Sequence, residues 1–408
     1  MNMFREHARP PKIDQFNYAN MHTSYLDMSI VNALPRAHNA HHGSTRQAHG
    51  TTMWSLKLAD VRAVKNDERR AMMGILETNL GEGQRSKSTV LVLGAAGRFG
   101  AEACLGFAAA GWTVYAQARK ALPEVIQDSV EFVHADALEY DKLLQQLREK
   151  NVSVDLIVHA LNPDYARWDQ LLPPITSAVI AIAKQTGALV MIPGNVYNFG
   201  RELPAQLTET TPFVANTPKA MQRIAMEEAF AEAAQDGVRT VLIRAGDFIG
   251  GTGTWLDMAM AKSLRKGVFT RMGDPHLSHA WAYLPDLAKT FVMVAERRAK
   301  LAHFEVFHYP GINASQSEVQ AAFESMMAQA LKVKAMPWGL MRVLGWVSPL
   351  ISAVVGMQYL WQRPHQLRGD KLMCLIGPLP QTSLHQALRE YVPAMPRQVN
   401  RKPSTKLA

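Results

Sequence analysis

The sequence predicts an α/β protein with a doubly wound parallel sheet and a small, mainly helical C-terminal substrate domain. Two observations lead to this prediction. Short apolar strands alternate with helices from Ser88 onward, and a glycine-rich turn joins the first strand to the first helix. Such alternation is typical of a parallel sheet, because each parallel connection needs a crossover. Strands that are apolar on both faces fit a sheet with helices on both sides.

The elements can be placed in order along the chain. Short runs rich in apolar and β-branched residues are the expected strands: 88–94, 112–118, 130–137, 154–161, 188–194 and 238–246. The segments between them are rich in alanine or carry apolar residues three or four positions apart, and are the expected helices: 101–111, 138–150, 175–187 and 217–229. The first strand, helix and second strand form a βαβ unit of about 30 residues.

The turn after the first strand reads GAAGRFG, with glycine at every third position. Glycines there permit a tight turn and let backbone N–H groups approach a pyrophosphate at the helix N-terminus. A glycine triplet alone is weak evidence, but between a strand and a helix of a βαβ unit it indicates a dinucleotide-binding Rossmann fold. We therefore expect Gly94, Gly97, Arg98, Phe99 and Gly100 to contact the cofactor. An ordinary βα turn is the alternative.

The end of the second strand bears on which dinucleotide is bound. An acidic residue about 20 positions after the glycines would hold the ribose hydroxyls of NAD. Here the strand ends YAQARK, so Gln117, Arg119 and Lys120 occupy that neighbourhood and no carboxylate does. Arginine suits a 2′-phosphate, because the contact is charge-assisted and bidentate. The prediction is NADP(H), with NAD(H) as the alternative. The alternative for Arg119 is a solvated loop residue, which would not distinguish NADP(H) from NAD(H).

Further segments resemble a known family. They are HADAL, which contains Asp136, DLIVHALNP, which contains Ala160 and Asn162, and the later LIRAGDFIGGTGTW and HAWAYLPDLAKTF. Over residues 88–390 the sequence resembles the atypical or extended short-chain dehydrogenases/reductases, and more narrowly the NAD-dependent epimerase/dehydratase family. The resemblance implies that Asp136 lies near the adenine and that Ala160 and Asn162 line the nicotinamide side.

The resemblance fails at the catalytic positions. The family combines Ser/Thr after the fifth strand with Tyr-x-x-x-Lys on the next helix. This sequence has Pro193, Gly194 and Asn195 after the strand, and Lys219 and Arg223 in place of tyrosine and lysine. The replacements are polar, and a spacing of four puts both cations on one helix face.

Changed chemistry is one interpretation of these replacements. Lys219 is then the catalytic proton donor, since burial and the charge of Arg223 lower a lysine pKa. Asn195 can hydrogen-bond a carbonyl oxygen, Tyr197 lies close by in the sequence, and Arg223 reaches the cofactor. The alternative is that Lys219 and Arg223 only bind cofactor phosphate or ribose, or lie in solvent.

Two functions from different classes follow. The first is an NADP(H)-dependent oxidoreductase or epimerase-like enzyme acting on a small carbonyl or hydroxyl compound. The alternative is a non-catalytic NAD(P)-binding regulator, a redox sensor that acts through a protein partner. The altered helix, Pro-Lys-x-x-x-Arg, is the feature that separates them.

The chain divides into four parts on pattern and composition. Residues 1–87 lack sustained periodicity and are expected to be a disordered extension. Its histidine-rich tract has no Cys or acidic ligand beside it, so no metal site is expected. The expected NAD(P)-binding domain is 88–250. A substrate or lid region with returning Rossmann elements follows at 251–394, and a basic tail at 395–408.

Charge, apolar runs and cysteines bear on partners and compartment. The net charge of +9 comes largely from residues 1–87 and the tail, so nucleic acid is not an expected partner. The apolar stretch 336–361 contains Arg342, prolines and glycines. No integral membrane span is expected there, and membrane-surface contact is the minority alternative. A small-molecule substrate is the expected partner, with a homodimer left open. Only two cysteines occur, which fits a cytoplasmic location.

Overall fold

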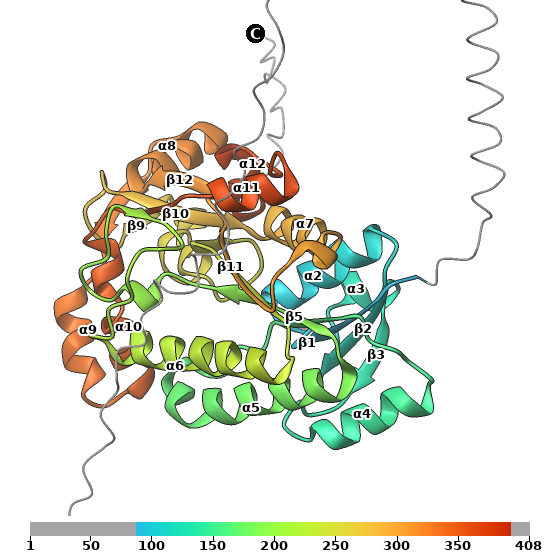
Figure 1. Ribbon diagram of the computed structural model, residues 1–408. Coiled ribbons are helices and arrows are strands. Elements are labelled where there is room, and N and C mark those ends of the chain that lie inside the picture. The colour runs from blue at the N-terminus through green and yellow to red at the C-terminus, as the bar shows by residue number, and fades with distance from the viewer. Residues whose placement is uncertain (1–86, 393–408) are drawn as a thin grey trace, which may run out of the picture. The chain divides into compact units, whose positions relative to one another are not determined.

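The computed structural model describes residues 87–392 (Figure 1). The histidine-rich tract and the basic tail lie outside the described residues, as does nearly all of the predicted N-terminal extension. The described part is built on one large sheet, with three small sheets toward the C-terminus.

The large sheet has seven strands in the order β11-β7-β5-β4-β1-β2-β3. Their bounds are β1 (Thr89–Leu93), β2 (Thr113–Ala118), β3 (Glu131–His134), β4 (Leu156–His159), β5 (Leu189–Gly194), β7 (Thr240–Arg244) and β11 (Phe304–His308). Every pair of neighbours is parallel. All six predicted strands are present, and β11 is an additional edge strand. The strand order reverses between β1 and β4, so this is the switch point at which such sheets bind ligands.

Helices cover both faces of this sheet (Figure 1). Their bounds are α2 (Arg98–Ala109), α3 (Glu124–Gln127), α4 (Tyr140–Glu149), α5 (Trp168–Thr186), α6 (Pro218–Ala233) and α7 (Leu284–Ala295). The first helix, α2, packs against α7 on one face, and α5 packs against α4 and α6 on the other. Alternate residues of β1 feed the two cores, Val90 and Val92 one and Leu91 and Leu93 the other. The predicted doubly wound α/β fold is confirmed.

The smaller C-terminal part combines helices and short strands. Its sheets are β8 (Asp247–Ile249) with β10 (Ser278–Tyr283) and β12 (Ile312–Ser315), β9 (Val268–Arg271) with β13 (Lys332–Ala335), and β6 (Gln206–Leu207) with β14 (Gln366–Leu367). Its helices are α8 (Gln316–Met327), α9 (Trp338–Gly345), α10 (Pro349–Val355), α11 (Asp370–Ile376) and α12 (Leu384–Leu388).

Helix α6, which carries the altered catalytic positions, begins at Pro218, one residue from the predicted start at 217. The Thr217 hydroxyl accepts a hydrogen bond from the Ala220 N–H at 3.0 Å, and Pro218 occupies the first turn. On its buried face, Glu227 accepts two hydrogen bonds from Arg244 of β7, at 2.8 and 3.1 Å. Both side chains are almost fully buried. This ion pair ties α6 to the sheet.

Removing one member of this pair should destabilise the protein strongly. We expect Glu227→Ala to lower the free energy of unfolding by about 3–5 kcal/mol, because the Arg244 charge is left buried and uncompensated. The neighbouring Glu228 is exposed, so Glu228→Ala is the matched control and should change stability by less than about 0.5 kcal/mol. Denaturant unfolding of both variants measures the difference, and equal stabilities would contradict this assignment.

Candidate functional site

The glycine loop between β1 and α2 is closely packed. Gly94 has φ +81°, which favours glycine, and its N–H donates to the backbone and side-chain oxygens of Gln117 at 3.1 and 3.0 Å. A Cβ on Gly100 would lie within 2.2 Å of the Gly94 oxygen, so a larger residue would displace the loop. Gly97 begins α2 without a side-chain cap, and the first turn holds no acid. The positive helix end is thus available to a phosphate.

Gln117 clamps this loop from the end of β2. Its side chain is 1% exposed, and its amide nitrogen donates to the Ala135 oxygen at 2.6 Å. Its amide oxygen meanwhile accepts from Gly94. Sequence reasoning noted Gln117 only as the lack of an acid. The structure gives it a second role, which is to fix the glycine loop against β2 and β3.

The two residues expected near the adenosine half lie together. Arg119 Nη1 is 3.4 Å from Asp136 Oδ2, at the carboxyl ends of β2 and β3. The arginine side chain is 72% exposed. Exposed ion pairs contribute little, about 0–1 kcal/mol, so this pair restrains Arg119 only weakly.

Arg98 and Phe99 have structural contacts of their own. Arg98 Nε donates to the Thr252 oxygen at 2.7 Å. The glycine-rich segment 250–253 packs so tightly here that a Cβ on Gly253 would meet the guanidinium. Phe99 is buried against Phe291, with ring centroids 4.8 Å apart. These side chains therefore join the loop to the rest of the fold, and only their backbone N–H groups face the helix end.

The residues expected on the nicotinamide side lie at the end of β4. The Ala160 N–H donates to the Leu93 oxygen at 2.9 Å, and the Ala160 carbonyl abuts Gly94. Asn162 is exposed in the following loop. Ala160 thus lines the same corner as the glycine loop.

Lys219 is held by an aromatic pair. Its ammonium donates to the Tyr165 backbone oxygen at 2.5 Å and lies 4.6 and 4.4 Å from the ring centroids of Tyr165 and Trp168. Burial lowers the pKa of Lys219 to about 8. The side chain is therefore buried, and both its hydrogen bond to the Tyr165 oxygen and its cation–π contacts orient it.

Arg223 is buried one helical turn further on. Its Nη2 donates to the Pro193 oxygen at 3.2 Å, at the end of β5. Its Nε has no hydrogen-bond partner among the described residues. Burial lowers the pKa of this guanidinium. Burial and then the Arg223 charge lower the pKa of His159, at the end of β4, to about 3.

Asn195 and Tyr197 form the turn after β5. The Asn195 side-chain oxygen accepts from the Tyr197 N–H at 3.0 Å, and its backbone oxygen accepts from Arg244 at 2.6 Å. The Tyr197 ring stands edge-on to that of Tyr165, with centroids 6.3 Å apart. Burial raises the pKa of both tyrosines, so their hydroxyls stay protonated.

Sequence reasoning missed one polar pair. Asp247 on β8 and His279 on β10 are 2.6 Å apart, Oδ2 to Nε2. The His279 ring stacks on Trp361 at 4.3 Å, with the planes 6° apart. The Asp247 charge also contributes to raising the pKa of Tyr197, which places the pair beside the candidate site. The segments holding both residues carried the family resemblance, but nothing in their spacing predicts the contact.

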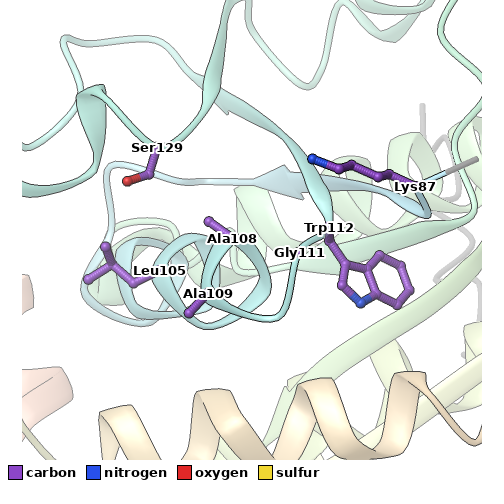
Figure 2. Close-up of a pocket in the computed structure, with 7 residues that line it drawn as sticks. All are labelled: Lys87, Leu105, Ala108, Ala109, Gly111, Trp112 and Ser129. Carbon is purple, nitrogen blue, oxygen red and sulfur yellow. The ribbon is translucent and has the colours of Figure 1, made fainter.

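A surface cavity lies elsewhere. Figure 2 shows it at the C-terminal end of α2, with a volume of about 420 Å³, lined by Lys87, Leu105, Ala108, Ala109, Gly111, Trp112 and Ser129. It faces the amino ends of β1 and β2, whereas ligands of open parallel sheets bind at the carboxyl ends. We therefore place the candidate site at the glycine loop. Residues 87–392 contain no cluster of metal-ligating side chains.

A parallel sheet with a glycine loop at its switch point defines a dinucleotide-binding α/β protein. The chain belongs to the NAD dependent epimerase/dehydratase family, whose sequence model matches residues 90–308. This confirms the predicted resemblance. No protein in a comparison with curated sequences matches the chain.

Several solved structures share the fold. A UDP-glucose-4-epimerase from Stenotrophomonas maltophila, with bound NAD and formylated UDP-arabinopyranose, is 16% identical with a TM-score of 0.60, over 74% of this chain and 96% of that one. An L-threonine dehydrogenase from Clostridium difficile is 17% identical with a TM-score of 0.61, over 76% and 97%. One from Phytophthora infestans is 16% identical with a TM-score of 0.60, over 75% and 98%.

The buried histidines should make stability depend on pH. Burial lowers the pKa of His159 and of His308 on β11 from 6.5 to about 3. Between these values the unfolded chain binds protons that the folded chain does not, so acid favours unfolding. Each histidine should contribute about 1.4 kcal/mol per pH unit to the slope.

One variant tests whether His159 contributes to the dependence of the unfolding free energy on pH. We expect His159→Asn to reduce the dependence of unfolding free energy on pH between pH 6 and about 4.5 by the contribution of one histidine, about 1.4 kcal/mol per unit. His303 is exposed, so His303→Asn should leave the slope unchanged. Denaturant unfolding at each pH measures it, and parallel curves for His159→Asn and the wild type would refute the assignment.

Proposed function

We propose that this protein is an NADP(H)-dependent oxidoreductase or epimerase-like enzyme that acts on a small carbonyl or hydroxyl compound. The observation that carries the proposal is the glycine loop at the switch point, with titratable side chains at the neighbouring strand ends. When bound there, a nicotinamide supplies or accepts a hydride. Relatives in fold include a sugar-nucleotide epimerase and threonine dehydrogenases, which act on hydroxyl-bearing compounds by name.

The preference for NADP(H) rests on the end of β2. The strand ends at Ala118, and Arg119 follows in a position that is exposed and weakly paired. A 2′-phosphate would offer Arg119 a stronger, charge-assisted partner than Asp136 does. The carboxylate that contacts Arg119, Asp136, follows the end of β3 and already accepts from the Leu138 N–H at 3.0 Å. NAD, which is bound in the epimerase structure named above, is the alternative cofactor.

We assign proton transfer to Lys219. With its pKa near 8, the side chain can both donate and accept a proton near neutral pH. In the direction of reduction, the Lys219 Nζ would give a proton to the substrate oxygen, a bound NADPH would supply the hydride, and a proton from solvent would restore the ammonium. Tyr197 remains protonated, so its hydroxyl is available to donate a hydrogen bond to the substrate. Arg223 supplies a fixed positive charge at the β5 end, which favours negative charge on a reacting oxygen.

A second candidate function is a cofactor-binding regulator without catalysis. One observation favours it: Lys219 and Arg223 both donate to backbone oxygens, those of Tyr165 and Pro193. In this case the two cations would only hold the loops at the strand ends. The enzyme oxidises NADPH in the presence of some member of a carbonyl panel. The regulator does not, and instead binds a protein partner in a way that depends on NADPH.

The remaining proposals concern organisation and compartment. We propose a cofactor domain at 88–250 and a substrate region at 251–394, supported by the return of β11 to the main sheet from the second part. The cytoplasm is the proposed compartment, since both Cys104 and Cys374 are free thiols.

The cofactor proposal has a direct test. Wild-type protein should bind NADPH more tightly than NADH, and Arg119→Ala should lose about 1–3 kcal/mol of NADPH affinity while NADH affinity stays the same. Lys120 is the exposed neighbour, and Lys120→Ala is the control. Fluorescence titration gives all affinities. Equal wild-type affinities for the two cofactors would exclude a 2′-phosphate site.

The role of Lys219 has a second test. Lys219→Met should abolish turnover yet leave NADPH affinity within a few-fold of wild type, whereas Arg223→Met should weaken NADPH binding. Because the protonated form donates, the wild-type rate of carbonyl reduction should fall as pH rises through about 8. Lys184→Met, at a half-exposed lysine on α5, is the control. Turnover that survives in Lys219→Met would remove the catalytic assignment.

A further inference from the structure

The C-terminal part carries a pair of helices that bury no side chain. Helices α9 and α10 are joined by residues 346–348, and we call residues 338–355 the hairpin. The two helices touch closely, since a Cβ on Gly345 would lie 3.3 Å from the Ser352 Cα. Yet neither helix contains a buried residue. A helix with a wide apolar face normally buries that face.

The apolar side chains of the hairpin are turned outward. Trp346 is 87% exposed and Val347 is 83% exposed, both at the tip. Other exposed apolar residues of the hairpin are Leu340, Val343, Leu344 and Leu350. Together with the two tip residues they are six of the thirteen large exposed apolar side chains in the part of the chain that the structure describes. A contiguous apolar surface of this kind marks a contact site.

The hairpin is held by a few contacts, among them two hydrogen bonds from α9 and the packing of α10 against the turn Tyr165–Arg167. Trp338 Nε1 donates to the Met272 oxygen at 2.7 Å, and Arg342 donates to the Gln358 side chain at 3.2 Å. Figure 1 shows α9 and α10 at the outer edge of the molecule, at the end remote from α3 and α4. The tip therefore projects from the fold while its base is fixed.

The chain segment that contains the hairpin carries only positive charges. Between Glu324 and Asp370 the chain has five Lys/Arg and no Asp or Glu. Three of these cations flank or belong to the hairpin and are exposed, Lys332, Lys334 and Arg342. An apolar tip with cations beside it and no acid is the composition of segments that bind an anionic lipid surface.

We propose that the hairpin is a docking surface for an anionic lipid bilayer, with Trp346 and Val347 inserted at the level of the headgroups. The charge pattern favours this occupant over a second copy of the chain. A symmetric dimer through the hairpin would bring Lys332, Lys334 and Arg342 against their own copies, and the segment between Glu324 and Asp370 supplies no acid to pair them. The basic segments outside residues 87–392 have the same sign of charge as the cations beside the hairpin, so we do not expect them to cover it.

The geometry fixes the depth of this contact. The two helices have eight and seven residues, so each is only about 10–12 Å long, far short of the hydrocarbon core. No helix among residues 87–392 is long and apolar enough to cross a membrane. The hairpin therefore lies in the interface.

Vesicle flotation with the full chain tests the proposal. The wild type should float with vesicles of phosphatidylcholine and phosphatidylglycerol, and much less with phosphatidylcholine alone or at high salt. Trp346→Ser combined with Val347→Ser should lower the partition coefficient about tenfold or more. The control combines Val125→Ser and Met221→Ser, at exposed apolar residues on α3 and α6, and should float like the wild type.

Each other outcome overturns the proposal. If wild type fails to float with anionic vesicles, the hairpin does not bind lipid. If the tip variant floats as well as wild type, another segment such as the basic tail is responsible. If the tip substitutions leave flotation unchanged but convert a dimer to a monomer in size-exclusion chromatography, a second copy covers the hairpin. Unchanged thermal unfolding of the tip variant shows that it remains folded.

Discussion

The buried ion pair between Arg244 and Glu227 determines where α6 stands on the sheet. Arg244 lies at the carboxyl end of β7, and its guanidinium also donates to the Asn195 backbone oxygen at 2.6 Å and contacts the Phe199 ring. A charge with so many fixed partners tolerates little displacement, because a buried charge must keep its partners. Lys219 and Arg223 share the helix face of Glu227, so this contact also fixes where the two cations lie relative to the sheet.

This anchoring determines what surrounds Lys219 and Arg223, the residues that replace the family's tyrosine and lysine. A cation four or eight residues before Glu227 faces the carboxyl ends of the central strands, where backbone oxygens point outward. Arg223 meets the Pro193 oxygen, and Lys219 meets that of Tyr165. The end of β5 and the turn Tyr165–Arg167 therefore each supply a backbone oxygen that accepts from one of the two cations. Both cations thus lie on the side of the sheet at which the carboxyl ends of β4 and β5 open, the side expected to bind the ligand.

The local sequence pattern was enough to predict the strands of the main sheet, but helix bounds and the edge strand depend on contacts between distant segments. The glycine loop and the six strands depend on neighbouring residues, so the sequence predicts them well. The helix α5 begins at Trp168, before the predicted 175, because Pro173 and Pro174 near its start mask the pattern. The edge strand β11 contains Glu305 and ends at His308, so its apolar signal is weak.

Side-chain partners were beyond prediction for the same reason. Asp247 meets His279 only because β8 and β10 pair in parallel and bring residues 32 positions apart together. Gln117 binds Gly94 across 23 positions. The sequence predicted that Lys219 and Arg223 share a helix face, but the rings that orient Lys219 belong to the segment before α5 and to α5 itself.

The hairpin and the candidate site share a structural neighbour. Helix α10 packs against the short 3₁₀ turn Tyr165–Arg167, and the Tyr165 oxygen of that turn holds the Lys219 ammonium. A hairpin inserted in lipid would therefore bring the Lys219 side of the site close to the bilayer surface. The two proposals thus concern neighbouring elements of the fold, linked through the turn Tyr165–Arg167.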